Sequence, residues 1–106
     1  MTQPVDASTR ADGVRRVVIA EDEALIRMDL AEMLGEEGYD VVGQAGDGQR
    51  AIELARELRP DLAILDVKMP KLTGLQATRE IRAQAPDVAV LILSMYDDER
   101  YLFEAL

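Results

Sequence analysis

Cysteine is absent from this sequence of 106 residues, which excludes a disulfide framework and any chemistry that depends on a thiol. Basic side chains are also in short supply, since 12 Lys and Arg stand against 21 Asp and Glu and leave a net charge of −9. A surface with this balance repels a phosphate backbone. The segment itself is therefore not expected to bind nucleic acid.

Long apolar runs are missing as well. No stretch approaches the roughly 18 residues that would span a bilayer, and the first dozen residues lack the apolar centre of a signal peptide. Residues 1–14 are polar and predict a disordered leader. We expect one cytoplasmic domain over residues 15–106, with no membrane contact and with enough hydrophobic residues (48%) for a modest core.

What the sequence does contain is an alternation of two periodicities. Short apolar runs rich in β-branched residues predict strands, and apolar residues at helical spacing predict helices between them. A last helix is predicted to begin at Asp98, with Leu102, Ala105 and Leu106 on one face. The other predicted strands are 16–20, 39–45, 62–65 and 88–93, and the other predicted helices are 24–37, the segment around 51–58, and 75–84.

This alternation predicts a doubly wound α/β fold with a parallel sheet, because strands joined through helices make right-handed crossovers. Apart from Arg16 at its start, the first strand is apolar throughout, and so are the third and fourth, as expected when helices cover both faces of the sheet. The pattern alone leaves the order of the strands open.

Polar side chains follow three of these strands where each one ends. Glu21-Asp22-Glu23 follows the first strand, Asp66 the third and Ser94 the fourth. The carboxyl ends of parallel strands form the functional edge of such a sheet. If the first and third strands are neighbours, Glu21, Asp22 and Asp66 converge, and three crowded carboxylates need a counter-charge. A hard divalent cation that prefers oxygen ligands, above all Mg²⁺, would supply it.

An Asp carboxylate beside Mg²⁺ is a competent nucleophile for phosphorus and gives an aspartyl phosphate. The Ser94 hydroxyl could donate a hydrogen bond to a phosphoryl oxygen and so report its presence. Each residue alone also has a purely structural explanation. The acidic triplet suits a helix N-terminus, Asp66 a loop cap, Ser94 a turn and Lys68 a solvated surface. The combination is harder to explain in this way. Acids at the ends of two strands and a hydroxyl at the end of a third favour a functional site over separate structural roles.

At these residues the sequence resembles the receiver domains of bacterial response regulators from Val17 to its last residue. The matching motifs are Glu21-Asp22, Asp66 within Leu65-Asp-Val-Lys-Met-Pro-Lys-Leu-Thr-Gly74, and Ser94. The resemblance implies a flavodoxin-like fold with strand order 2-1-3-4-5 and a phosphoryl group accepted on Asp66 from a histidine kinase. It implies Mg²⁺ bound by Asp22, Asp66 and the main-chain carbonyl of Lys68, with Glu21 acting through water. Ser94 would be the switch hydroxyl, and the only catalysis would be the domain's own phosphorylation and dephosphorylation.

Two features depart from the family pattern. The sequence stops at Leu106, before the fifth strand with its usual lysine and before the fifth helix, so the receiver is expected to be truncated. The edge 88–93 would then be open, which favours low stability or pairing of two copies.

The resemblance is also mosaic. Residues 20–30 are similar to receivers joined to ANTAR RNA-binding antiterminator domains, and residues 91–106 to NarL/FixJ-type regulators with a DNA-binding helix-turn-helix. Control of transcription through a DNA-binding effector outside this sequence is the first expectation. An RNA-binding effector and a stand-alone receiver are the alternatives.

Three other classes of protein share part of this pattern. A flavodoxin-like cofactor binder would need a phosphate-binding loop where the acidic triplet stands. A phosphohydrolase with an Asp nucleophile would be expected to carry a second acid at the position of Lys68, and a degenerate receiver would typically lack one of the three acids. Acetyl phosphate with Mg²⁺ separates them, because a receiver keeps the label, a hydrolase turns the donor over, and a degenerate receiver does neither.

Overall fold

The structure, a computed structural model, describes residues 13, 15–96 and 99–105, with side chains up to residue 93. The leader predicted over residues 1–14 therefore lies, except for Gly13, outside the described residues. In the described part of the chain, no helix is long and apolar enough to cross a membrane.

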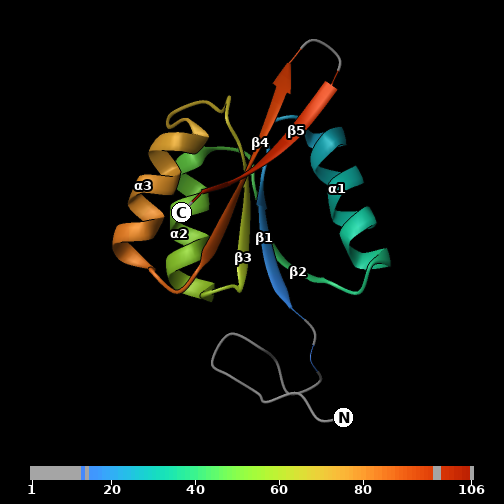
Figure 1. The fold of residues 1–106 in the computed structure, drawn as a ribbon, viewed down its shortest axis with the longest axis horizontal. Coiled ribbons are helices and arrows are strands. Elements are labelled where there is room, and N and C mark those ends of the chain that lie inside the picture. The colour runs from blue at the N-terminus through green and yellow to red at the C-terminus, as the bar shows by residue number, and fades with distance from the viewer. Residues whose placement is uncertain (1–12, 14, 97–98, 106) are drawn as a thin grey trace.

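Strands and helices alternate along the chain from β1 to β4, and a further strand, β5, follows β4 (Figure 1). The elements are β1 (Arg16–Ala20), α1 (Ala24–Glu36), β2 (Asp40–Ala45), α2 (Gly48–Leu58), β3 (Leu62–Asp66), α3 (Gly74–Gln84), β4 (Ala89–Tyr96) and β5 (Glu99–Ala105).

The strands form one sheet in the order β2-β1-β3-β4-β5. The first four run parallel, which confirms the predicted doubly wound, flavodoxin-like arrangement with order 2-1-3-4. β1 lies between β2 and β3, so it is an inner strand, and its last four residues are fully buried. This order brings the ends of β1 and β3 together.

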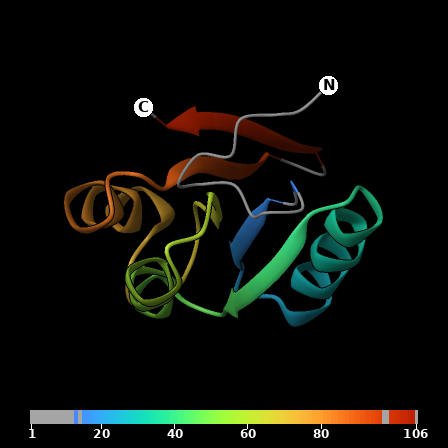
Figure 2. The same cartoon turned by 90° about the horizontal axis from the view of Figure 1, so that it is seen from below.

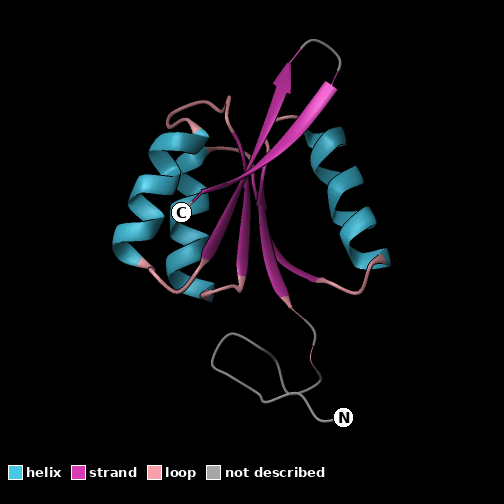
Figure 3. Ribbon diagram, viewed as in Figure 1, coloured by secondary structure: helices cyan, strands magenta, loops and turns pink. Residues whose placement is uncertain are grey.

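The helix predicted after Asp98 is wrong over the described residues, because 99–105 form β5, antiparallel to β4 (Figure 3). The open edge predicted at 88–93 is wrong for the same reason, since the pairing runs from Val90 with Ala105 to Tyr96 with Glu99. A strand edge presents unsatisfied N–H and C=O groups, and a nearby segment rich in Tyr, Leu and Phe can satisfy them. Asp98, the predicted cap, lies outside the described residues.

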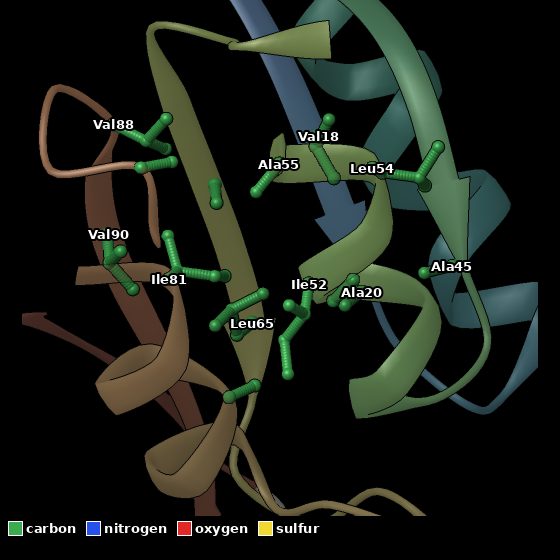
Figure 4. Close-up of a cluster of buried hydrophobic side chains, with 14 of the residues drawn as sticks. Val18, Ala20, Ala45, Ile52, Leu54, Ala55, Leu65, Ile81, Val88 and Val90 are labelled. Atoms are coloured by element: carbon green, nitrogen blue, oxygen red, sulfur yellow. The ribbon is translucent and has the colours of Figure 1, made fainter. Parts of the chain in front are cut away.

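Helices cover both faces of the sheet, with α2 and α3 on one side and α1 on the other (Figure 2). The α2–α3 side holds the larger core, in which Val18 and Leu65 of the sheet pack with Ile52, Ala55 and Ile81 of the helices (Figure 4). The α1 side holds a smaller cluster built on four buried residues, which are Val17, Ile19, Ile64 and Leu93. Burial on both faces explains the uninterrupted apolar sequence of the inner strands.

Candidate functional site

The predicted acidic residues lie together at the carboxyl end of the sheet. Ala20 of β1 pairs with Leu65 of β3, and the next residues along the two strands are Glu21 and Asp66. One carboxylate oxygen from each of Glu21, Asp22 and Asp66 can be chosen so that all three atoms lie within 4.8 Å of one another. The neighbouring position of β1 and β3 is therefore what assembles the cluster.

The three carboxylates differ in their access to solvent. Glu21 is 1% exposed and Asp66 9%, whereas Asp22 is exposed. The Oε2 atom of Glu21 is shielded from solvent. Carboxylates this close repel one another, and burial of two of them makes a counter-charge more valuable. An all-oxygen donor set with one side open to water fits a hard divalent cation such as Mg²⁺.

The segment that carries Glu21 and Asp22 is held by hydrogen bonds at Glu21 and at Glu23. The main-chain N–H of Glu21 donates to the carbonyl of Ala45 in β2 over 3.0 Å. The N–H of Glu23 donates to Glu21 Oε1 over 3.4 Å, and the N–H of Arg27 donates to the carbonyl of Glu23 over 2.9 Å. The two acids are therefore held between β2 and the first turn of α1.

The loop after Asp66 folds back against the strand that it leaves. The Val67 N–H donates to the Leu93 carbonyl of β4 over 3.0 Å, and the Gly74 N–H donates to the Val67 carbonyl over 2.9 Å. Gly74 sits so close that a Cβ on it would overlap the main-chain oxygen of Asp66. Lys68 is exposed in this loop, and the metal-binding role of its main-chain carbonyl stays a prediction.

The start of α2 is tied to this loop. Asp47 caps α2 by accepting a hydrogen bond from the Arg50 N–H over 2.8 Å, and its carboxylate lies 3.6 Å from the Lys71 ammonium. The Arg50 N–H, and secondly the Lys71 charge, lower the pKa of Asp47 below its ordinary value of 3.8. A Cβ on Gly48 would overlap Leu72, so α2 and the loop are in direct contact.

Arg27 is a residue near the site that sequence reasoning missed. Its Nη1 atom donates to the main-chain carbonyl of Glu21 over 2.6 Å. Local patterns carry no signal for this contact, because it joins the first turn of α1 to a residue six positions earlier. The one available hint is that Arg27 is the only basic residue among the eight acids of residues 21–40.

The prediction that Ser94 follows the fourth strand is wrong, because pairing with β5 extends β4 to Tyr96 and Ser94 lies within it. Ser94 is placed only through its main chain, which pairs with Tyr101 in the β4–β5 ladder. Its side chain lies outside the described part of the structure, so the proposed switch role of the hydroxyl stays a prediction.

Comparison with known proteins identifies the family of the chain. Residues 17–106 match the response regulator receiver domain family. The chain is 57% identical over 101 residues to the transcriptional regulatory protein PdtaR of Mycobacterium tuberculosis, covering 92% of this chain and 48% of that protein. It thus spans about half the length of that relative.

Solved structures share the fold. The response regulator domain of Thermotoga maritima CheB is similar with a TM-score of 0.73 and 38% identity, over 76% of this chain and 60% of that one. The response regulator TrrA of Thermotoga maritima, solved in complex with Mg(2+)-BeF, gives a TM-score of 0.74 and 36% identity, over 79% of this chain and 72% of that one. With Glu21, Asp22 and Asp66 assembled at the end of such a sheet, the chain belongs to the response regulator receiver domains of two-component signalling systems.

Proposed function

We propose that this domain accepts a phosphoryl group on Asp66, with Mg²⁺ bound beside it, from a sensor histidine kinase. The observation that carries the proposal is the cluster of Glu21, Asp22 and Asp66, with carboxylate oxygens within 4.8 Å of one another. A similar receiver, TrrA, was solved in complex with Mg(2+)-BeF, which supports the binding of Mg²⁺ by a domain of this fold.

The metal would be held by Asp22 and Asp66 and by the main-chain carbonyl of Lys68, with Glu21 acting through water. When bound, Mg²⁺ neutralises the crowded carboxylates and the charge of the phosphoryl oxygens. Asp22 is exposed and offers the cation a route from solvent, whereas the buried Glu21 adds charge from within the protein. This division suits a cation that binds from solvent to a preformed carboxylate frame.

Asp66 acts as the nucleophile. One of its carboxylate oxygens attacks phosphorus of the phosphohistidine, so that an O–P bond forms as the N–P bond breaks. The histidine nitrogen leaves with the electron pair of that bond. The Ser94 hydroxyl would then donate a hydrogen bond to a phosphoryl oxygen and pass the change to the β4 end of the sheet.

The output proposed for the whole protein is control of transcription. This rests on the likeness to PdtaR, which is named a transcriptional regulatory protein, and on the sequence resemblances to regulators with nucleic-acid-binding effectors. The first expectation is a DNA-binding helix-turn-helix effector, and the alternatives are an ANTAR RNA-binding effector and a stand-alone receiver. The test compares binding of the full-length, phosphorylated protein to duplex DNA and to structured RNA. Binding to DNA supports the helix-turn-helix effector, binding to RNA supports the ANTAR effector, and binding to neither supports the stand-alone receiver.

Incubation with acetyl phosphate and Mg²⁺ tests the proposed chemistry. We expect one phosphoryl group per chain, acid-stable and alkali-labile as an acyl phosphate is, and strictly dependent on divalent metal. Continuous turnover of acetyl phosphate without retained label would identify a hydrolase. No label and no turnover would identify a degenerate receiver and would overturn the proposal.

A further inference from the structure

We propose that Arg27 is a positioning residue of the acidic site, which holds the main chain of Glu21 so that Glu21 and Asp22 keep the geometry that binds the metal. This inference rests on the proposed function and adds a residue to it. Arg27 is not a ligand in this proposal, because its contact is with a main-chain oxygen and its charge has the same sign as the metal.

The contacts of Arg27 enclose the acidic segment from both ends. Its main-chain N–H donates to the carbonyl of Glu23, and its guanidinium donates to the carbonyl of Glu21 over 2.6 Å. The Glu21–Glu23 segment is therefore bound to one residue at its first and last carbonyl. A short hydrogen bond from a charged donor is about twice as strong as a neutral one.

The guanidinium also lies against the end of β2. A Cβ on Gly46 would stand 3.5 Å from Arg27 Nη1, an ordinary packing distance. The Ala45 carbonyl, one residue earlier, accepts the N–H of Glu21. Arg27 is half-buried at this junction, so its orientation is restricted by packing as well as by hydrogen bonding. The Arg27 side chain therefore lies where the segments that follow β1 and β2 meet the first turn of α1.

The start of α1 has no side-chain cap, which makes the Arg27 contact more important for holding it in place. The N-cap residue Glu23 makes no side-chain hydrogen bond to the helix, so the usual device for fixing a helix start is absent. The Arg27 side chain donates a 2.6 Å hydrogen bond from the first turn of α1 back to the Glu21 carbonyl, and a longer bond of 3.4 Å joins the Glu23 N–H to Glu21 Oε1. Loss of the Arg27 bond should loosen the position of both acids.

Charge and position predict opposite effects of removing Arg27, which makes the inference testable. Residues 21–40 contain eight acids and Arg27 as the one basic residue. If Arg27 acted only through its charge, Arg27→Ala would strengthen Mg²⁺ binding, because a repelling cation would be gone. If Arg27 holds the ligand segment in place, the same change weakens binding. Removal of groups that orient metal ligands typically costs about 10–100-fold in affinity.

The experiment measures Mg²⁺ affinity by calorimetry for the wild-type chain and for Arg27→Ala, Arg27→Lys and Arg27→Gln. The expected order of affinity is wild type, then Lys, then Gln and Ala, with Ala weaker by about tenfold or more. Arg56→Ala is the matched control, because it removes one exposed positive charge whose side chain contacts Gln84, far along α2 and α3. The control should bind Mg²⁺ as the wild type does.

Labelling with acetyl phosphate over a range of Mg²⁺ concentrations is the second readout. The half-saturating Mg²⁺ concentration should rise with Arg27→Ala while the rate at saturating metal changes much less, because the nucleophile Asp66 is untouched. A general loss of stability would not produce this split. If Arg27→Ala does not fold, the Arg27→Lys and Arg27→Gln variants test the inference, with Mg²⁺ affinity expected to fall from wild type to Lys to Gln.

Wild-type affinity or tighter binding in the folded Arg27 variants would overturn the inference while leaving the proposed function intact. A wild-type chain that neither binds Mg²⁺ nor takes label would instead remove the proposed function, and this inference with it.

Discussion

The α-carbon of Gly74 lies against the main-chain oxygen of Asp66, with no room between them for a Cβ. This contact lets the seven residues between the end of β3 and the start of α3 fold back to the site, where the Gly74 N–H donates a hydrogen bond to the Val67 carbonyl. Glycine is required here by the close approach of two backbone segments.

Gly74→Ala should therefore destabilise the fold by about 1–3 kcal/mol, the usual cost of overpacking, and should displace Asp66. Denaturant unfolding measures the first effect, and the rate of labelling by acetyl phosphate measures the second. Gly35→Ala is the matched control, because Gly35 lies in α1 with nothing within 4 Å of an added Cβ. Alanine there should stabilise the helix by up to about 1 kcal/mol. Equal stability of the two variants would contradict the role given to Gly74.

Asp66→Asn should abolish labelling and leave the fold intact, because the amide keeps the volume of the side chain and loses the nucleophile. Removing one of three crowded charges should also keep or raise the melting temperature of the metal-free protein. The measurement is label per chain from acetyl phosphate, together with a thermal melt. Asp29→Asn, at an exposed acid of α1, should label normally. Retention of full label by Asp66→Asn would show that another residue is the acceptor.

Mg²⁺ should raise the melting temperature, because it binds the folded carboxylate cluster and not the unfolded chain. At a metal concentration of 100 times the Kd, the gain in the free energy of unfolding is about 2.7 kcal/mol. Chelation by EDTA should reverse the gain. Asp22→Asn should reduce the gain, because it removes the exposed carboxylate that is proposed to bind the metal. A melting temperature that is the same with and without millimolar Mg²⁺ would count against the site.

Asp47→Ala should cost about 1 kcal/mol, the typical value for loss of an N-cap. The pKa of Asp47 is lower in the folded protein than its ordinary value of 3.8, so its contribution is complete above that value and disappears as the pH falls through the lower, folded pKa. Unfolding free energies of the two forms should therefore differ at pH 6 and converge in acid. Lys71→Ala, which removes an ion pair with a 69% exposed lysine, should cost less than about 1 kcal/mol. A difference that persists unchanged in acid would exclude the charged carboxylate as the cause.

Sequence alone determined the parallel α/β architecture from β1 to β4 and the placement of the acids at strand ends. Both follow from local periodicity, because apolar runs specify buried strands and the residue after each strand must emerge at the carboxyl edge. The order 2-1-3-4 was not available from periodicity and came from the family resemblance. The structure shows what this strand order does: β1 is hydrogen-bonded to both β2 and β3, and this places Glu21 beside Asp66.

Only the tertiary structure decided the state of residues 99–105 and the contact of Arg27. The segment 99–105 has an apolar face at helical spacing and also β-prone side chains, so its pattern suits either state. The backbone groups at the edge of β4, which no local pattern encodes, select the strand. Arg27 likewise reads as an ordinary helical residue until the fold brings its guanidinium to the carbonyl of Glu21. Hydrogen-bond partners that lie apart in the sequence are set by how the chain packs, and for that reason the three-dimensional structure was needed to find them.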